Sequence, residues 1–135
     1  MAREIETKCI HLEEEENSIN HYGAISYPIY QSATYAHPGV GQSTGYDYSR
    51  LQNPTREHLE KTVASLENGI DALAFSSGMA AITLMMELFK PGDHLIVDAD
   101  LYGGSIRLFN HVSEKNRIEF SSVDCHNENV AAYIR

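Results

Sequence analysis

From residue 54 onward, the hydrophobic and polar positions recur at a helical spacing. Three apolar residues lie at positions i, i+4 and i+7 and form one stripe: Leu59, Val63 and Leu66. The segment Asn-Pro-Thr at 53–55 is typical of a helix start, with Thr55 as the N-cap, and Asn68-Gly69 is typical of a helix stop. The pattern therefore predicts an amphipathic helix between these two signals.

Beyond residue 69, short apolar runs alternate with longer stretches of helical character. The short runs indicate strands and the longer stretches indicate helices. Strands that alternate with helices form right-handed βαβ units, so we expect an α/β fold with a mainly parallel sheet. The expected elements are a buried strand over 70–75, an apolar and therefore buried helix over 80–89, a strand over 94–98, a helix over 104–114 with Ile106, Phe109 and Val112 inward, a strand over 118–123, and a helix from about residue 127.

Residues 1–54 have a different character, because they are rich in Tyr, Ser, Gly, Asn and His and show little periodicity. This composition predicts an extended, irregular arm without a core of its own. Several of its apolar side chains need a surface to pack against: Ile25, Tyr27, Ile29, Tyr30 and Tyr35. We therefore expect two parts, an intersubunit arm over 1–54 and the start of a larger domain over 55–135. The chain stops at Arg135, inside a predicted crossover helix, so we expect an N-terminal piece of a larger α/β protein.

Composition and charge exclude several classes of partner. The 135 residues carry 10 Lys and Arg against 19 Asp and Glu, a net charge of −9. This balance argues against nucleic acid and anionic membranes as partners. The run Glu13 to Glu16 is interpreted as a solvated patch. No stretch is apolar enough to span a bilayer, and the first residues have no secretory signal.

The cysteines and histidines point to no metal site. Cys9 and Cys125 are far apart and fit no ligand spacing, so we expect free thiols and a cytoplasmic protein. None of the seven histidines lies three or four residues from another, which disfavours a helical metal site.

The junction Ser76-Ser77-Gly78-Met79, between a predicted strand and a predicted helix, is a candidate phosphate site. Glycine lets the backbone approach a ligand closely, and the first N–H groups of a helix attract anions. The junction matches neither the dinucleotide-binding pattern GxGxxG nor the Walker pattern, which disfavours dinucleotides and nucleoside triphosphates. A simple turn of small residues is the alternative interpretation.

Two further segments could contribute to a ligand site. Arg50 can bind a phosphate bidentately, and Tyr48 can donate to the same oxygens. Tyr102, followed by Gly103-Gly104-Ser105, comes just after the strand over 94–98 and can place its ring over a flat ligand. The alternatives are a surface arginine beside packed tyrosines and a glycine-rich turn.

Together these segments resemble one family closely, the Cys/Met-metabolism pyridoxal 5′-phosphate (PLP) enzymes, which include the cystathionine γ-synthases, γ-lyases and β-lyases. The resemblance implies an aspartate-aminotransferase-like fold of type I, of which this chain holds the N-terminal arm and the first βα units of the large domain. The segments that carry it follow one another along almost the whole chain: Gly23-Ala24-Ile25, Pro28 to Tyr35, Tyr48-Ser49-Arg50, Asn53-Pro54-Thr55, Leu66-Glu67, Ser77-Gly78-Met79-Ala80-Ala81 and Tyr102-Gly103-Gly104-Ser105.

The resemblance implies a role for each candidate residue. The loop with Ser77, Gly78 and Met79 would bind the cofactor phosphate, the last two through their backbone N–H groups. Tyr102 would stack on the pyridine ring and act as a catalytic residue near the reacting carbons of the substrate.

The resemblance gives Tyr48 and Arg50 a role between subunits. They would bind the phosphate of the neighbouring subunit's PLP, so the active site would belong to a homodimer, and we expect a tetramer of such chains.

The resemblance also shows what the chain lacks. The family needs a lysine that binds PLP covalently, an aspartate at the pyridinium nitrogen and an arginine for the substrate carboxylate. None of the four lysines has the expected context: Lys8, Lys61, Lys90 and Lys115. We therefore expect the 135 residues alone to be inactive.

The leading hypothesis for the whole protein is a lyase or transferase that acts on a small amino-acid substrate in cysteine, methionine and cystathionine metabolism by β- or γ-elimination or γ-replacement. Gly104 disfavours a methionine γ-lyase, because those enzymes resemble this stretch but carry a cysteine there. The alternative hypothesis is a truncated, non-catalytic polypeptide that serves only for oligomerisation and phosphate binding.

Overall fold

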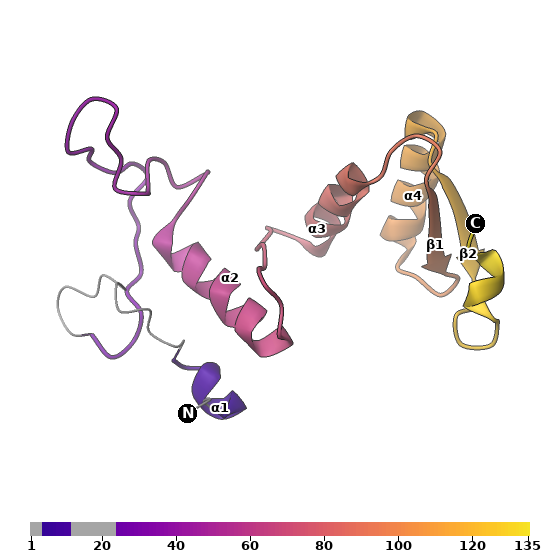
Figure 1. Cartoon of the computed structure of the whole chain (residues 1–135), viewed down its shortest axis with the longest axis horizontal. Helices are drawn as coiled ribbons and strands as arrows, with labels where there is room; N and C mark the ends of the chain where they lie inside the picture. The colour runs from indigo at the N-terminus through magenta and orange to yellow at the C-terminus, as the bar shows by residue number, and fades with distance from the viewer. Residues whose placement is uncertain (1–3, 12–23) are drawn as a thin grey trace. The chain divides into compact units, whose positions relative to one another are not determined.

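The computed structural model describes residues 4–11 and 24–135, which form two compact units that divide between Ala74 and Phe75 (Figure 1). The first unit contains the short helix α1 (Ile5–Lys8) and the long helix α2 (Pro54–Glu67). Its remaining described residues are irregular, apart from one antiparallel bridge between Thr34 and Tyr48. The acidic run at 13–16 and Gly23 lie outside the described residues.

Asn53, rather than the predicted Thr55, is the N-cap of α2. Asn53 has an extended backbone, and its Oδ1 accepts a hydrogen bond from the Thr55 backbone N–H at 2.9 Å. The prediction was wrong because Pro54 fits the first helical position, where its missing N–H costs nothing. The predicted stop is confirmed, since Asn68 adopts the left-handed conformation and the Gly69 N–H bonds to the Ala64 carbonyl.

Replacing Asn53 with alanine is expected to destabilise the protein by about 1–2 kcal/mol, because it removes the cap of α2. The Asn53 amide nitrogen also lies 2.9–3.2 Å from three acceptors, Tyr30 O, Tyr35 Oη and Ser49 Oγ. Denaturant unfolding of the full-length protein measures the effect. Asn110→Ala, at an exposed position of a helix, is the control and should change stability by less than about 0.5 kcal/mol.

The second unit contains the predicted strand–helix–strand arrangement. Strands β1 (His94–Asp98) and β2 (Glu119–Val123) pair in parallel, in register from His94 opposite Glu119 to Asp98 opposite Val123. Helix α4 (Gly103–Asn116) connects them, and its C-cap is Arg117, which has a left-handed backbone. The expectation of an α/β fold with parallel strands is confirmed. The other elements of this unit are the helix α3 (Gly78–Met85) and the 3₁₀ helices η1 (Met86–Leu88) and η2 (Val130–Tyr133).

Helix α4 lies along the two strands (Figure 1), and α4 and β1 both contribute residues to the core of the second unit. Met86, Val97, Phe109 and Ile118 are buried together there, with Val112 packed against them. The predicted inward position of Ile106 is wrong, because its side chain is 37% exposed. Leu101, which lies between β1 and α4, also packs against this core.

Three other predicted elements differ from the structure. Residues 70–75 are not a strand, and Ile70 and Leu73 are exposed. The apolar helix over 80–89 is shorter than predicted and is not buried, because α3 ends at Met85 and Leu88 is 78% exposed. The last helix is a 3₁₀ turn that leaves Ile134 outside it. A central strand needs paired neighbours and covering helices, and the described part of the chain offers none to residues 70–75.

Candidate functional site

The start of α3 has the open helix terminus that the predicted anion site requires. Ser77 is the N-cap, and its Oγ accepts a hydrogen bond from the Ala80 N–H at 3.1 Å. Within the described residues, the backbone N–H groups of Gly78 and Met79 have no hydrogen-bond partner. A Cβ built on Gly78 meets no atom within 4 Å, so the approach to these donors is open. Two unpaired donors at the positive end of a helix dipole can hold a phosphate.

Tyr102 lies at the start of α4, as its N-cap, and its side chain is 70% exposed. Its ring lies over Gly104, where an added Cβ would be 2.5 Å from Tyr102 Cε1. The same Cβ would be 3.2 Å from the Met79 sulfur. The Met79 Sδ also lies 3.9 Å from Oγ of the buried Ser105. The starts of α3 and α4 therefore meet, and the structure brings Ser77, Gly78 and Met79 close to Tyr102.

This arrangement fits a flat ligand that carries a phosphate. The free N–H groups of α3 offer the phosphate site, and Tyr102 offers an exposed aromatic face beside it. The residues present are thus compatible with PLP. Tyr102 follows the pattern of α/β proteins, where ligands bind at the carboxyl ends of strands, because it comes shortly after β1.

Tyr48 and Arg50 lie together in the first unit. The Arg50 guanidinium carbon is 5.1 Å from the centre of the Tyr48 ring, a cation–π arrangement. Both side chains are exposed. An exposed guanidinium beside a phenol hydroxyl can bind a phosphate from outside the chain.

The segment that carries Tyr48 and Arg50 is held by Arg56, which the sequence analysis did not single out. The Arg56 guanidinium donates to the carbonyl oxygens of Ser49 at 3.3 Å, Arg50 at 3.5 Å and Leu51 at 2.5 Å. It also pairs with Glu60 at 3.5 Å. Arg56 is a cation in the first turn of α2, where it opposes the helix dipole. This unfavourable placement was the sequence signal that Arg56 has a role other than stabilising the helix.

Tyr46 attaches the same segment to the side of α2. Its hydroxyl donates to the Glu57 carboxylate, which pairs with Lys61 at 2.8 Å. The Lys61 ammonium, followed by the Tyr46 hydroxyl, lowers the pKa of Glu57 from its ordinary value. Burial and the bond to Glu57 raise the pKa of Tyr46. At neutral pH, Glu57 is therefore ionised and accepts a hydrogen bond from the Tyr46 hydroxyl.

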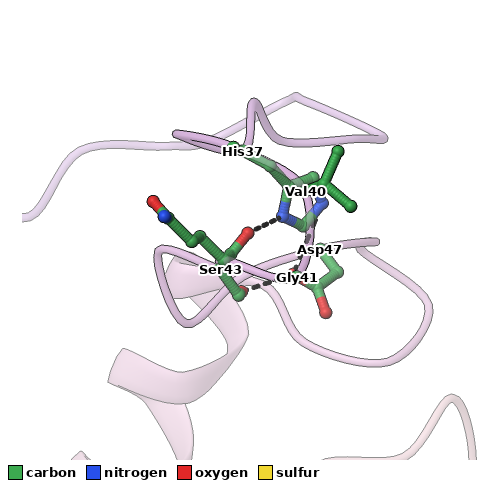
Figure 2. Close-up of a pocket in the computed structure, with 7 residues that line it drawn as sticks. His37, Val40, Gly41, Ser43 and Asp47 are labelled. Atoms are coloured by element: carbon green, nitrogen blue, oxygen red, sulfur yellow. Dashed lines mark hydrogen bonds and ion pairs between the residues drawn. The ribbon is translucent and has the colours of Figure 1, made fainter.

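A shallow hollow lies in the loop over 37–47 of the first unit. His37 Nδ1 donates to the Gln42 carbonyl at 2.8 Å, and Ser43 Oγ donates to Asp47 Oδ1 at 2.5 Å (Figure 2). His37 Nε2 lies 3.6 Å from the same carboxylate oxygen. None of the six predicted site residues lines this hollow, which is formed by His37, Gly39, Val40, Gly41, Gln42, Ser43 and Asp47.

Two other kinds of feature are absent from the described residues. Over 4–11 and 24–135, no three His, Cys, Asp or Glu side chains gather in a way that could hold a metal ion. Within the same ranges, no helix has both the length and the apolar character that crossing a membrane requires.

Comparison with known proteins places the chain in a family. Residues 6–135 match the family model described as Cys/Met metabolism PLP-dependent enzyme. The chain is 48% identical over 130 residues to a cystathionine gamma-synthase/O-acetylhomoserine (thiol)-lyase of Bacillus subtilis (strain 168), a match that covers 93% of this chain and 34% of that enzyme. It is 53% identical over 102 residues to a cystathionine gamma-lyase of the same organism, a match that covers 76% of this chain and 27% of the relative.

A solved structure supports the same assignment. Cystathionine gamma-lyase from Lactobacillus plantarum, complexed with L-serine, matches with a TM-score of 0.81 and 40% identity, over 97% of this chain and 33% of that one. This similarity confirms the expected type I PLP-dependent fold. The chain spans about a third of the length of these relatives. The chain thus belongs to the Cys/Met metabolism family of PLP-dependent enzymes.

Proposed function

We propose that the chain is the N-terminal part of a PLP-dependent lyase or transferase that acts on cysteine, methionine or cystathionine-like amino acids by β- or γ-elimination or γ-replacement. The observation that carries the proposal is the meeting of two features in the second unit. The free N–H groups of Gly78 and Met79 lie beside the exposed ring of Tyr102. Relatives at 48–53% identity are named as enzymes of this kind.

The residues of the second unit have distinct roles in this proposal. When bound, PLP supplies an electron sink for carbanions at Cα of the substrate, and for γ-chemistry also at Cβ. Gly78 and Met79 bind the cofactor phosphate through their N–H groups, and Ser77 holds the loop in place by capping α3. Tyr102 would offer its exposed ring to the cofactor, and its hydroxyl would exchange a proton with the substrate.

The first unit serves a second subunit in this proposal. Tyr48 and Arg50 bind the phosphate of the cofactor in a neighbouring subunit, and the enzyme is a homodimer or a tetramer built from such dimers. Exposed apolar side chains of the first unit support an intersubunit role, because Ile25 is 88% and Ile29 is 77% exposed. The protein acts in the cytoplasm.

The remaining catalytic groups lie outside these 135 residues in this proposal. They are the lysine that binds the cofactor covalently, the aspartate at the pyridinium nitrogen and the arginine for the substrate carboxylate. The 135 residues alone therefore bind no PLP covalently and turn over no substrate. The second candidate, a non-catalytic module for oligomerisation and phosphate binding, rests on the same open start of α3.

The test is carried out on the full-length protein, with and without PLP. We expect visible absorption from covalently bound cofactor and release of a keto acid from cystathionine. In Tyr102→Phe, the ring is kept and the hydroxyl is lost, so PLP affinity should stay within about twofold while kcat falls at least about tenfold. Normal kcat in Tyr102→Phe removes the hydroxyl from proton transfer. No absorption band and no turnover in the unaltered protein favours the non-catalytic module.

A further inference from the structure

We propose that Arg56 is a positioning residue, which fixes the segment 48–51 in the conformation that presents Tyr48 and Arg50 to a phosphate. The consequence for cofactor binding rests on the proposed function, in which these two side chains serve a neighbouring subunit. The attachment of the segment to Arg56 does not rest on it, because all of its contacts lie within the first unit.

The Arg56 guanidinium contacts three consecutive carbonyl groups. Its Nη1 donates to the carbonyls of Ser49 at 3.3 Å and Arg50 at 3.5 Å, and its Nη2 donates to that of Leu51 at 2.5 Å. A guanidinium is a planar fork of several N–H donors, so it can bind several acceptors at fixed relative positions. One side chain therefore constrains the backbone at three successive residues.

The carbonyls over 49–51 depend on Arg56. The N–H groups of Leu51 and Gln52 donate to the Tyr48 carbonyl at 2.9 and 3.0 Å, which closes a turn. Within residues 4–11 and 24–135, Arg56 is the one donor to the three carbonyls that follow. Apart from the bridge at Tyr48, the segment belongs to no helix or strand. Its conformation is therefore set by the turn and by Arg56.

Glu60 orients the Arg56 guanidinium from the other side. Its Oε1 lies 3.5 Å from Arg56 Nε, and its side chain is only 15% exposed. The same oxygen accepts a hydrogen bond from the Ala74 N–H at 2.9 Å, so the carboxylate is itself held in place. All three guanidinium nitrogens thus contact groups of this chain. Arg56 therefore acts through the segment and need not touch the phosphate itself.

Arg50 has the complementary arrangement. Its side chain is exposed, and its guanidinium carbon lies 5.1 Å from the centre of the Tyr48 ring. A guanidinium binds a phosphate bidentately only when its two N–H groups face the oxygens. The Arg50 carbonyl is one of the three that Arg56 holds, so a change there would turn the Arg50 side chain away.

The test compares Arg56→Lys with Arg107→Lys in the full-length protein. Arg56→Lys keeps the charge and removes the fork, and Arg107→Lys makes the same change at an exposed position of α4. The first readout is hydrogen–deuterium exchange in the cofactor-free protein. We expect the N–H groups of Leu51 and Gln52 to exchange faster in Arg56→Lys and to be unchanged in Arg107→Lys. Unchanged exchange in Arg56→Lys overturns the proposal.

The second readout is the dissociation constant for PLP. We expect Arg56→Lys to raise it about tenfold, because the charged hydrogen bonds of Arg50 are weakened, and Arg107→Lys to change it less than about twofold. In an Arg50→Ala background, Arg56→Lys should raise it less than about twofold further. A general loss of stability would lower the affinity equally in both backgrounds, and that result would contradict positioning through Arg50. Normal affinity in Arg56→Lys would overturn the proposal as well.

Folding and function are separated by the same variants. Arg56→Lys is chosen because Arg56→Ala also removes the partner of Glu60. Failure of Arg56→Lys to fold would overturn the proposal, since Arg56 would then be a requirement of the fold as a whole. If the unaltered protein binds no PLP but exchange rises as expected, the positioning of the segment stands and the proposed function fails. If PLP binds normally and both readouts are unchanged in Arg56→Lys, the proposed function stands and the positioning role fails.

Discussion

Replacing Gly78 with aspartate is expected to lower the affinity of the full-length protein for PLP by about 100-fold or more. The carboxylate would stand at the first position of α3, beside the two free N–H donors. Two like unit charges about 4 Å apart repel each other by about 4 kcal/mol at an effective dielectric constant of about 20. The cofactor phosphate carries up to two negative charges. The dissociation constant of the cofactor measures the effect.

The same substitution should not destabilise the fold. An acidic side chain in the first turn of a helix is favourable by about 0.3–1 kcal/mol, and the Cβ at position 78 meets no atom within 4 Å. The melting temperature of the cofactor-free protein should therefore stay the same or rise. This combination of lost affinity and retained stability separates a phosphate site from a structural turn.

Gly78→Asn is the matched control, because it has nearly the same shape without the charge. We expect it to keep much more of the affinity than Gly78→Asp. Inorganic phosphate provides an independent probe, since it should raise the melting temperature of the unaltered protein and leave that of Gly78→Asp unchanged. Full PLP affinity in Gly78→Asp would mean that the phosphate binds elsewhere.

The elements that were predicted correctly are those whose partners lie nearby in the sequence. Residues 94–123 form a complete strand–helix–strand unit. The backbones of β1 and β2 therefore hydrogen-bond to each other, and the apolar side chains of β1, α4 and β2 pack together. Residues 70–75 have the apolar character of a strand, but no described strand pairs with them. Periodicity indicates where a segment can be buried, whereas burial itself requires the neighbours to be present.

The candidate site shows the same division between local and long-range causes. The capped helix start at Ser77 and Gly78 could be predicted, because such a start follows from a few consecutive residues. Arg56 was missed in its present role. It acts on carbonyl groups five to seven residues away. Such a role depends on where side chains meet after folding, which no motif of consecutive residues contains.

Replacing Arg50 with alanine is expected to weaken PLP binding by about 10- to 100-fold, the cost of losing a charged hydrogen-bond donor to a phosphate. Arg50 is exposed beside Tyr48, and its guanidinium has no described carboxylate partner, so the fold should be retained. Equilibrium dialysis against PLP measures the loss. Arg107→Ala removes another exposed arginine, which lies in α4, and should leave the affinity within about twofold.

Hybrid dimers test whether Arg50 serves the neighbouring subunit. One subunit carries Arg50→Ala, and the other lacks the lysine that binds PLP covalently. Each homodimer has two defective sites. If Arg50 acts across the interface, one of the two sites in the hybrid combines an intact lysine with an intact Arg50, so activity should return to about half of the unaltered level. Hybrids that form but remain inactive would place the action of Arg50 within its own chain.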